Sequence, residues 1–340
     1  MSPEPLEETA RRIEDWLLDS EIQIAAGAHR GGVAGWLDAS GRAEFVYLEI
    51  TGYYLTATAW LAAGAATDAE RARRALARGR DALDWLRSVT ADGALPPTRL
   101  YLDADPGDWR NSCVFTFDLA MAARGAARFG AISGADTGSV VRDLVGRIGV
   151  TVPLPSHEQV GVQAPPARWS TRPGVYHLKA AAALLRLPPA VVGEALAGAC
   201  RGSVSHWTAV LETTAAGGTL HPFLYGVEGL LLVPTSPALD VAEAVYTRVL
   251  AAVPAEGRSD VVAQALRVGA LLRASGRLQG DGPRRGLAEL ATALARYVRP
   301  DGGVAFAAGQ DRANAWCAMF AHQALVFATR AETAAADFLI

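Results

Sequence analysis

Residues 220–233, LHPFLYGVEGLLLV, are apolar except for one His, one Tyr and one Glu. In a helix, His221 and Tyr225 are four positions apart, and Tyr225 and Glu228 are three apart, so the three side chains share one face. A buried ionisable group costs free energy unless it is paired or used. This polar face on an apolar helix therefore predicts one wall of a pocket.

The rest of the chain repeats this alternation of apolar and amphipathic helices. Segments with helical periodicity are separated by short loops rich in Gly, Pro and Asp, and patterns typical of β-strands are almost absent. The sequence therefore predicts an all-α protein. Segments that are apolar nearly all round predict inner helices, at 45–63, 109–129, 176–187, 220–233, 259–274 and 312–331. Amphipathic segments predict outer helices, at 5–26, 68–88, 138–148, 190–197 with a continuation near 203–214, 238–252 and 286–297.

The order of these segments predicts a closed ring. Helix pairs that repeat along a chain form either an open solenoid or a ring, and an open stack would leave one apolar inner surface in water. Residues 152–173 carry many prolines and little periodicity, so we interpret them as a loop. No linker is apparent, and we expect residues 1–340 to form one domain.

Composition narrows the classes of function. Of 340 residues, 51% are hydrophobic and the formal net charge is −3, which gives no indication of a nucleic-acid or acidic-membrane partner. The N-terminal residues MSPEPLEETARRIEDW lack the apolar run of a secretory signal, so we expect a cytoplasmic protein. The three cysteines are far apart and predict free buried thiols: Cys113, Cys200 and Cys317.

Three groups of residues resemble a known superfamily. They are Gly31-Gly32 with Gly35-Trp36 before residues 47–54, then His221-Pro with Tyr225-Gly and Glu228-Gly, and Gly302-Gly303 before Asn314-Ala-Trp316. Together with six helix pairs they resemble the α/α-toroid enzymes, and look most like bacterial toroid proteins of polysaccharide or specialised-metabolite biosynthesis. The resemblance implies an (α/α)6 toroid of six outer–inner helix hairpins, with a ligand in the funnel where loops enter the inner helices. It is specific for architecture and not for a reaction.

Several motifs of the better-defined branches are missing. Class II terpenoid cyclases need a DxDD acid, which the acidic cluster at 103–108, DADPGD, does not match. Zinc-dependent lanthionine cyclases need a Cys-His pair, and no such dipeptide occurs. We therefore expect no metal and no cofactor.

Unusual polar and aromatic residues lie in the predicted first turns and entry loops. Glu49 and Tyr53 are one turn apart, as a proton-transfer pair needs, although Glu49 could equally pair with an Arg. We interpret Asp118 as a structural partner of a neighbouring helix and Asp311 as a helix cap. The candidate catalytic residues are Glu49, Tyr53, His221, Tyr225 and Glu228. The candidate substrate-binding residues are Trp36, Tyr54, Trp109, Arg110, Tyr176, His177, Asp260, Arg312, Asn314 and Trp316.

These residues support three hypotheses about function. The first is metal-independent acid–base chemistry on a carbohydrate or glycoconjugate, by hydrolysis, elimination or epimerisation, with an anionic group held by Arg110 or Arg312. The second is a zinc-independent biosynthetic cyclase acting on a modified peptide, as lanthionine cyclases do, or on a terpenoid. The third is a non-catalytic toroid that binds a ligand. Aromatic walls suit both a sugar face and a cationic intermediate, so the sequence does not choose between substrates.

Overall fold

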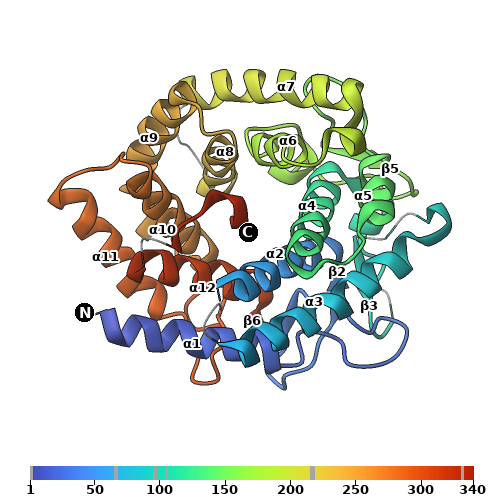
Figure 1. The fold of residues 1–340 in the computed structure, drawn as a ribbon, viewed down its shortest axis with the longest axis horizontal. Coiled ribbons are helices and arrows are strands. Elements are labelled where there is room, and N and C mark those ends of the chain that lie inside the picture. Colours follow the sequence, from blue (N-terminus) through green and yellow to red (C-terminus); the bar gives the residue numbers. More distant parts are fainter. Residues whose placement is uncertain are drawn as a thin grey trace.

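The computed structural model describes residues 3–64, 68–94, 96, 98–104, 106–214, 219–330 and 333–340. Asp105 of the acidic cluster lies outside these residues. The helices form two concentric rings around one axis (Figure 1). The inner ring contains α2 (Leu48–Gly64), α4 (Thr116–Ser133), α6 (His177–Leu185), α8 (Leu220–Leu232), α10 (Ser259–Ala274) and α12 (Ala315–Thr329). The outer ring contains α1 (Pro3–Asp19), α3 (Ala69–Thr90), α5 (Gly138–Val145), α7 (Pro189–Thr213), α9 (Ser236–Leu250) and α11 (Asp281–Ala295).

The inner ring is closed. Each inner helix contacts the next, and α12 contacts α2, so every inner helix has two inner neighbours as well as outer helices behind it. All the residues of α8 are buried for this reason, His221 and Glu228 included. The predicted all-α toroid of outer–inner hairpins is confirmed.

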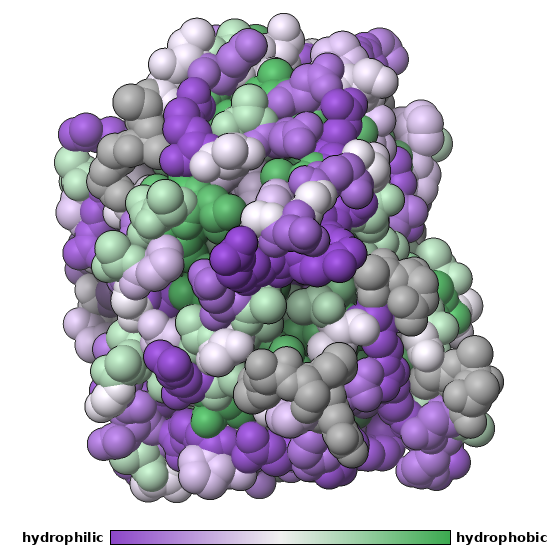
Figure 2. Space-filling view, turned by 90° about the vertical axis from the view of Figure 1, so that its left-hand side faces the viewer, coloured by the Kyte–Doolittle hydropathy of each residue, from purple (hydrophilic) through white to green (hydrophobic). Residues whose placement is uncertain are grey.

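The outer helices are amphipathic, as their sequences predict. Figure 2 shows the flank formed by α9, α11 and the start of α1, where hydrophilic side chains cover most of the surface and apolar areas are small. The opposite face of each outer helix supplies core residues such as Ile13 and Leu294. Burial of these faces against the inner ring holds the two layers together.

Close approach of two inner helices depends on glycine. A Cβ on Gly125 of α4 would lie 2.1 Å from the backbone oxygen of Gly52 in α2, and a Cβ on Gly52 would lie 2.6 Å from Cα of Ala122. Real side chains do not tolerate such contacts, so the absence of a Cβ on both helices sets their separation.

Short antiparallel strands and 3-10 turns cap the end of the ring where the inner helices begin. The strand pairs are β1 (Trp36–Leu37) with β6 (Ala313–Asn314), β2 (Phe45–Tyr47) with β3 (Arg99–Tyr101), and β4 (Cys113–Phe115) with β5 (His157–Gln159). The 3-10 turns are η1 (Ala91–Gly93), η2 (Trp109–Ser112), η3 (Trp169–Thr171), η4 (Val253–Glu256) and, at the opposite end of the ring, η6 (Ala336–Phe338).

These strands correct three predicted helix starts. Residues 45–47, 113–115 and 313–314 are extended because each pairs with a distant segment, so the helices begin later than the apolar patterns do. Consequently α4 begins at Thr116 and not at Trp109, which places Asp118 in its first turn. Asp311 is not the cap of α12, because the side chain of Asn314 accepts the Cys317 N–H at 3.0 Å.

Three outer helices also differ from the prediction, and one of them, α11, begins at Asp281, five residues before its predicted start. Helix α1 ends at Asp19 because Gln23 leaves the helix, bridges Val33 and donates to the Gly31 and Arg78 carbonyls at 3.0 and 2.8 Å. The two pieces expected near 190–197 and 203–214 form one element, α7, which is kinked at Gly193, where φ is 70°. The predicted loop 152–173 contains β5 and η3.

The C-terminal residues enter the centre of the ring (Figure 1). Asp337 pairs with Arg186, which follows α6, and with Arg128 late in α4, so these residues lie at the end of the ring opposite the helix starts. Buried side chains bind their backbone: Lys179 and Arg267 donate to the Ile340 oxygen at 2.8 and 3.0 Å, and Gln323 donates to the Phe338 carbonyl at 2.7 Å. Residues 336–340 therefore close the floor of the ring.

The described residues also bear on the cysteines and on membrane-spanning helices. Cys113, Cys200 and Cys317 are free and buried, as expected. No helix in the described part of the chain combines the length and apolarity needed to cross a membrane.

Candidate active site

A cavity of about 350 Å³ opens where the inner helices begin. Each inner helix contributes a residue from its first turns or just before it: Glu49, Asp118, Tyr176, His221, Asp260 and Trp316. The entry segments add aromatic and cationic residues: Tyr47, Arg99, Trp109, Arg110, Phe115, Arg168, Trp169, Arg258 and Phe306. A concave aromatic site with a few converging polar groups is the usual form of a small-molecule site.

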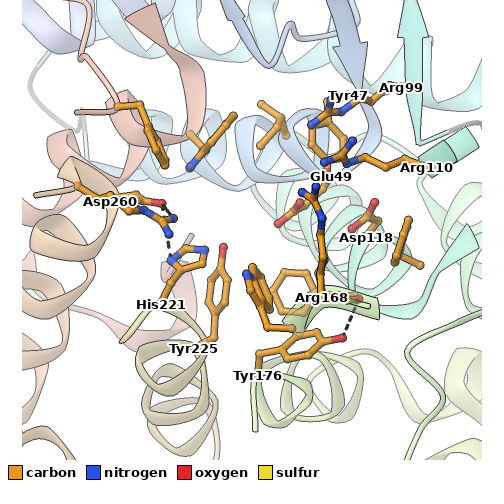
Figure 3. A pocket seen from close by; sticks show the side chains of 18 of the residues that line it. Tyr47, Glu49, Arg99, Arg110, Asp118, Arg168, Tyr176, His221, Tyr225 and Asp260 are labelled. Carbon is orange, nitrogen blue, oxygen red and sulfur yellow. Dashed lines mark hydrogen bonds and ion pairs between the residues drawn. The ribbon is translucent and has the colours of Figure 1, made fainter. Parts of the chain in front are cut away.

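Two carboxyl groups occupy one side of the cavity (Figure 3). Burial, and then the charge of Glu49, raise the pKa of Asp118 well above its ordinary value. Burial also raises the pKa of Glu49, although hydrogen bonds from Tyr53 and Tyr47 oppose the rise. Among the described residues, nothing hydrogen-bonds to Oδ2 of Asp118, and this residue is only 5% exposed. Both shifts favour the protonated carboxyl group, and the shift is larger at Asp118 than at Glu49.

His221 lies on the other side of the cavity (Figure 3). Its Nδ1 is 2.5 Å from Oε1 of Gln264 and 3.7 Å from Asp260. Burial lowers the pKa of His221 to about 4, so the ring is neutral at pH 7. Because Oε1 of Gln264, as oriented, only accepts, the ring proton is assigned to Nδ1 and Nε2 keeps its lone pair. His221 is therefore suited to accept a proton through Nε2.

A chain of hydroxyl groups links the two sides. The Tyr53 hydroxyl hydrogen-bonds Glu49 and lies 3.1 Å from the Tyr225 hydroxyl, within hydrogen-bond distance. Tyr225 lies beside His221, with ring centroids 4.4 Å apart. Lys179 lies beneath both tyrosines, with Nζ 4.6 and 5.1 Å from the Tyr225 and Tyr53 centroids. The candidates Glu49, Tyr53, His221 and Tyr225 are thus brought together, with Tyr53 beneath the cavity wall.

Glu228 has a different position. It is 0% exposed and forms ion pairs with Lys179 at 2.8 Å and Arg267 at 2.5 Å, two side chains that are also 0% exposed. The carboxylate does not line the cavity but lies in the floor beside the C-terminal residues. The two cations outweigh burial and lower the pKa of Glu228, so it is a fixed anion under the site.

Four arginines line the cavity: Arg99, Arg110, Arg168 and Arg258. Arg258 is held by Asp260, with guanidinium–carboxylate distances of 3.1 and 2.6 Å. Arg99 and Arg110 share the single carboxylate of Asp108, at 3.2 and 3.0 Å. Asp260 is therefore a partner of Arg258 and His221 on the cavity wall.

The remaining predicted binding residues divide between cavity and periphery. Trp109, Arg110, Tyr176, Asp260 and Trp316 line the cavity, as predicted. A neighbouring open groove of about 840 Å³, which shares Phe306 and Trp316 with the cavity, contains Trp36, Arg312 and Asn314.

Two of the predicted binding residues lie away from both the cavity and the groove. The Tyr54 hydroxyl donates to the Leu17 carbonyl at 2.8 Å, so it points toward the outer helix α1. His177 is 0% exposed and accepts the Gly174 N–H at 3.2 Å.

Sequence reasoning missed several lining residues. The predicted start at Trp109 puts Asp118 deep inside its helix, whereas α4 begins seven residues later and its first turn aims Asp118 at the cavity. Arg99, Arg168 and Trp169 lie on entry segments that carry no motif, so no signal in the sequence indicated them. In the described residues, no three His, Cys, Asp or Glu side chains gather closely enough to hold a metal ion.

Comparisons with known proteins give structural relatives only. Neither a family model nor a curated protein matches the sequence. Among solved structures, a sugar epimerase from a ruminal bacterium superimposes with a TM-score of 0.68 at 10% identity, covering 96% of this chain and 98% of that one. A D-mannose isomerase gives 0.67 at 11% identity, covering 97% and 98%.

A third relative performs different chemistry. A type II terpene cyclase from Scytonema, in complex with geranylgeranyl dihydroxybenzoate, matches with a TM-score of 0.59 at 13% identity and covers 97% of this chain and 99% of that one. These likenesses extend over nearly whole chains, and they establish that the chain has the α/α-toroid fold. At such low identities they establish the fold and not the reaction.

Proposed function

We propose that this protein is a cytoplasmic α/α-toroid enzyme, formed by residues 1–340 as one domain, that performs acid–base chemistry on a carbohydrate or glycoconjugate. The observation that carries the proposal is the pairing of a neutral His221 with the carboxyl groups of Asp118 and Glu49 on opposite sides of one aromatic cavity (Figure 3). Proton transfer at neutral pH needs a base and an acid, and here their pKa values are shifted in opposite directions.

Of the three reaction types, proton abstraction suits these groups best. Nε2 of His221 would remove a proton from the carbon next to a carbonyl group. The electron pair would pass to the carbonyl oxygen, which Asp118 would protonate to give the enol. Glu49 would then give a proton to the other face of the carbon while the enol oxygen returns its proton to Asp118, which gives the epimer; Glu49 would regain its proton from His221. The side chains of this chain supply both proton donor and acceptor, so the proposal includes no metal ion or cofactor. The sugar epimerase and mannose isomerase among the structural relatives support this choice.

Glu49, Tyr53 and Tyr225 would serve as the path that resets these protonation states. A row of hydroxyls ending in a carboxyl group can pass a proton in either direction without any side chain moving far. Glu228 takes no proton in this proposal, because Lys179 and Arg267 hold it ionised beneath the floor.

Deuterium exchange tests the proposal. Aldoses, ketoses, uronic acids and their disaccharides would be incubated with the enzyme in D₂O and followed by NMR for deuterium at the carbon next to the carbonyl. We expect exchange with at least one of them, and its loss in His221→Asn. The matched control is His206→Asn, because His206 is exposed on the outer helix α7. Exchange that persists in His221→Asn would refute the assigned base.

A second function is favoured by one specific observation. A protonated Asp118 with a free Oδ2, surrounded by Trp109, Phe115, Phe117 and Tyr225, is also a suitable acid for starting the cyclisation of a terpenoid. The terpene cyclase among the structural relatives is consistent with this reading. Assays with a prenylated hydroxybenzoate separate the two functions: a cyclase would need Asp118 and would retain activity in His221→Asn.

A further inference from the structure

Three arginines gather at one end of the cavity, on segments distant in sequence. Arg99 comes from β3, Arg110 from η2, and Arg168 from the residue before η3 (Figure 3). All three line the cavity, whereas the fourth arginine, Arg258, is held by Asp260 in two hydrogen bonds. The three therefore form a separate cationic group, which we call the arginine cluster.

The arginine cluster has fewer counter-charges than cations. Arg99 and Arg110 share one carboxylate, that of Asp108, and among the described residues no ion pair joins Arg168 to an acid. In the same part of the chain, no ion pair joins the cluster to Glu49 or Asp118. Among the described residues, the ion pairs of the cluster therefore set three guanidinium groups against one carboxylate, which leaves it net positive beside Glu49 and Asp118.

Aromatic rings lie against the guanidinium groups of the cluster in the absence of a ligand. Arg99 lies 4.4 Å from the centroid of Phe45, and Arg110 and Arg168 lie 4.6 and 5.9 Å from that of Trp109. The backbone around Arg168 is anchored, because its N–H donates to the Thr171 hydroxyl at 2.9 Å. Guanidinium groups fixed on aromatic rings lose little entropy when they bind an oxyanion.

We propose that the arginine cluster is a subsite for an oxyanion, a carboxylate or a phosphate, carried by the substrate. This inference rests on the proposed function and names its substrate class: an acidic or phosphorylated sugar and not a neutral one. Arg110 and Arg168 would hold the anion, and Arg99 would orient Arg110 through Asp108. The anion would place the reacting carbon between His221 and Asp118, which line the same cavity.

Matched ligands test the subsite. D-glucose, D-glucuronate and D-glucose 6-phosphate, with the corresponding mannose series, inorganic phosphate and pyrophosphate, would be titrated calorimetrically at low and high salt. We expect the charged sugars to bind at least about tenfold more tightly than the neutral sugar, with the difference shrinking at high salt. Glucuronate and glucose 6-phosphate distinguish a carboxylate from a phosphate, and preference for either one supports the subsite.

Variants connect the preference to the cluster. Arg110→Gln and Arg168→Gln should each reduce the ratio of charged-sugar to neutral-sugar affinity about tenfold. Arg201→Gln should leave this ratio unchanged, since Arg201 is exposed on α7 and pairs with Glu194. Arg168 is itself exposed, so its variant is expected to fold even if the Arg110 variant does not.

The outcomes separate this inference from the proposed function. Equal binding of neutral and charged sugars, or a preference that survives in Arg168→Gln, would overturn the subsite while leaving the carbohydrate function standing. Binding of pyrophosphate that depends on Arg168, without binding of any sugar, would support the subsite and overturn the carbohydrate function. An absence of binding by every ligand would overturn both.

Discussion

Replacing Glu228 by Gln removes the carboxylate that pairs with both Lys179 and Arg267 while nearly preserving the shape of the side chain. All three side chains are 0% exposed, and the ion pairs measure 2.8 and 2.5 Å. Removing one partner of a buried ion pair leaves an uncompensated charge and typically costs about 3–5 kcal/mol of unfolding free energy. We expect a loss in that range for Glu228→Gln in urea titrations at pH 7, because Lys179 and Arg267 keep their hydrogen bonds to the Ile340 oxygen but lose both ion pairs with Glu228.

The pH dependence of this variant gives a second measurement. Burial already lowers the pKa of Lys179 to about 8, and the carboxylate of Glu228 opposes that shift, so the pKa falls further in the variant. The unfolded Lys keeps its ordinary pKa and binds a proton over a range of pH in which the folded Lys does not. Stability of the variant should therefore rise with pH between the folded and unfolded pKa values, by at most about 1.4 kcal/mol per pH unit.

A surface pair provides the control. Glu194→Gln breaks an ion pair with Arg201 whose two side chains are 89% and 56% exposed, and exposed pairs contribute little. Equal stability losses in the two variants would refute the reasoning, as would a loss in Glu228→Gln below about 1 kcal/mol. The activity of the folded fraction distinguishes a structural from a catalytic role of Glu228. If Glu228 only supports the floor of the ring, activity per folded molecule should fall far less in Glu228→Gln than in His221→Asn.

Two further predictions concern the ring and the reaction. Gly125→Ala should destabilise the protein by about 1–3 kcal/mol in thermal melting, because the new Cβ would clash with the Gly52 oxygen. The control is Gly198→Ala on α7, where the nearest atom to the new Cβ is the end of a side chain at 3.9 Å. This variant should be as stable as the unchanged protein or more stable. In pH–rate profiles of kcat/KM, activity should hold on the acid side down to about pH 4, because His221 with a pKa of about 4 stays unprotonated, and should fall on the alkaline side as Asp118 loses its proton. An acid limb near 6.5 would exclude His221 as the base.

The sequence predicted much of the candidate site because first-turn residues of the inner helices converge in this architecture. His221 and Tyr225 meet Glu49 through Tyr53 across the ring, although the two helices are far apart in the chain. Glu228 lies on the same helix face as His221 and Tyr225, but two turns deeper, where the ring is filled by Lys179 and Arg267. Spacing along a helix gives direction and not depth, so this difference could not be predicted.

The position of Asp118 depends on where its helix begins, which the hydrophobic pattern did not predict. Its helix was expected to begin at Trp109, but residues 113–115 pair instead with His157–Gln159, so the first turn of the helix falls around Asp118. The arginine cluster could not be predicted either, because its three members come from segments with no periodicity. They meet only when the loops fold over the ring.

The sequence by itself determined the layers and the closure of the fold, because the helical period of apolar residues decides locally which faces need to be buried. The tertiary structure alone decided where the helices begin, which ionisable groups are sealed beneath the floor, and which loop residues enter the cavity. Those features depend on strand pairing, backbone approach and burial between distant segments, and the free energy of each is set by its partners and not by its neighbours in sequence.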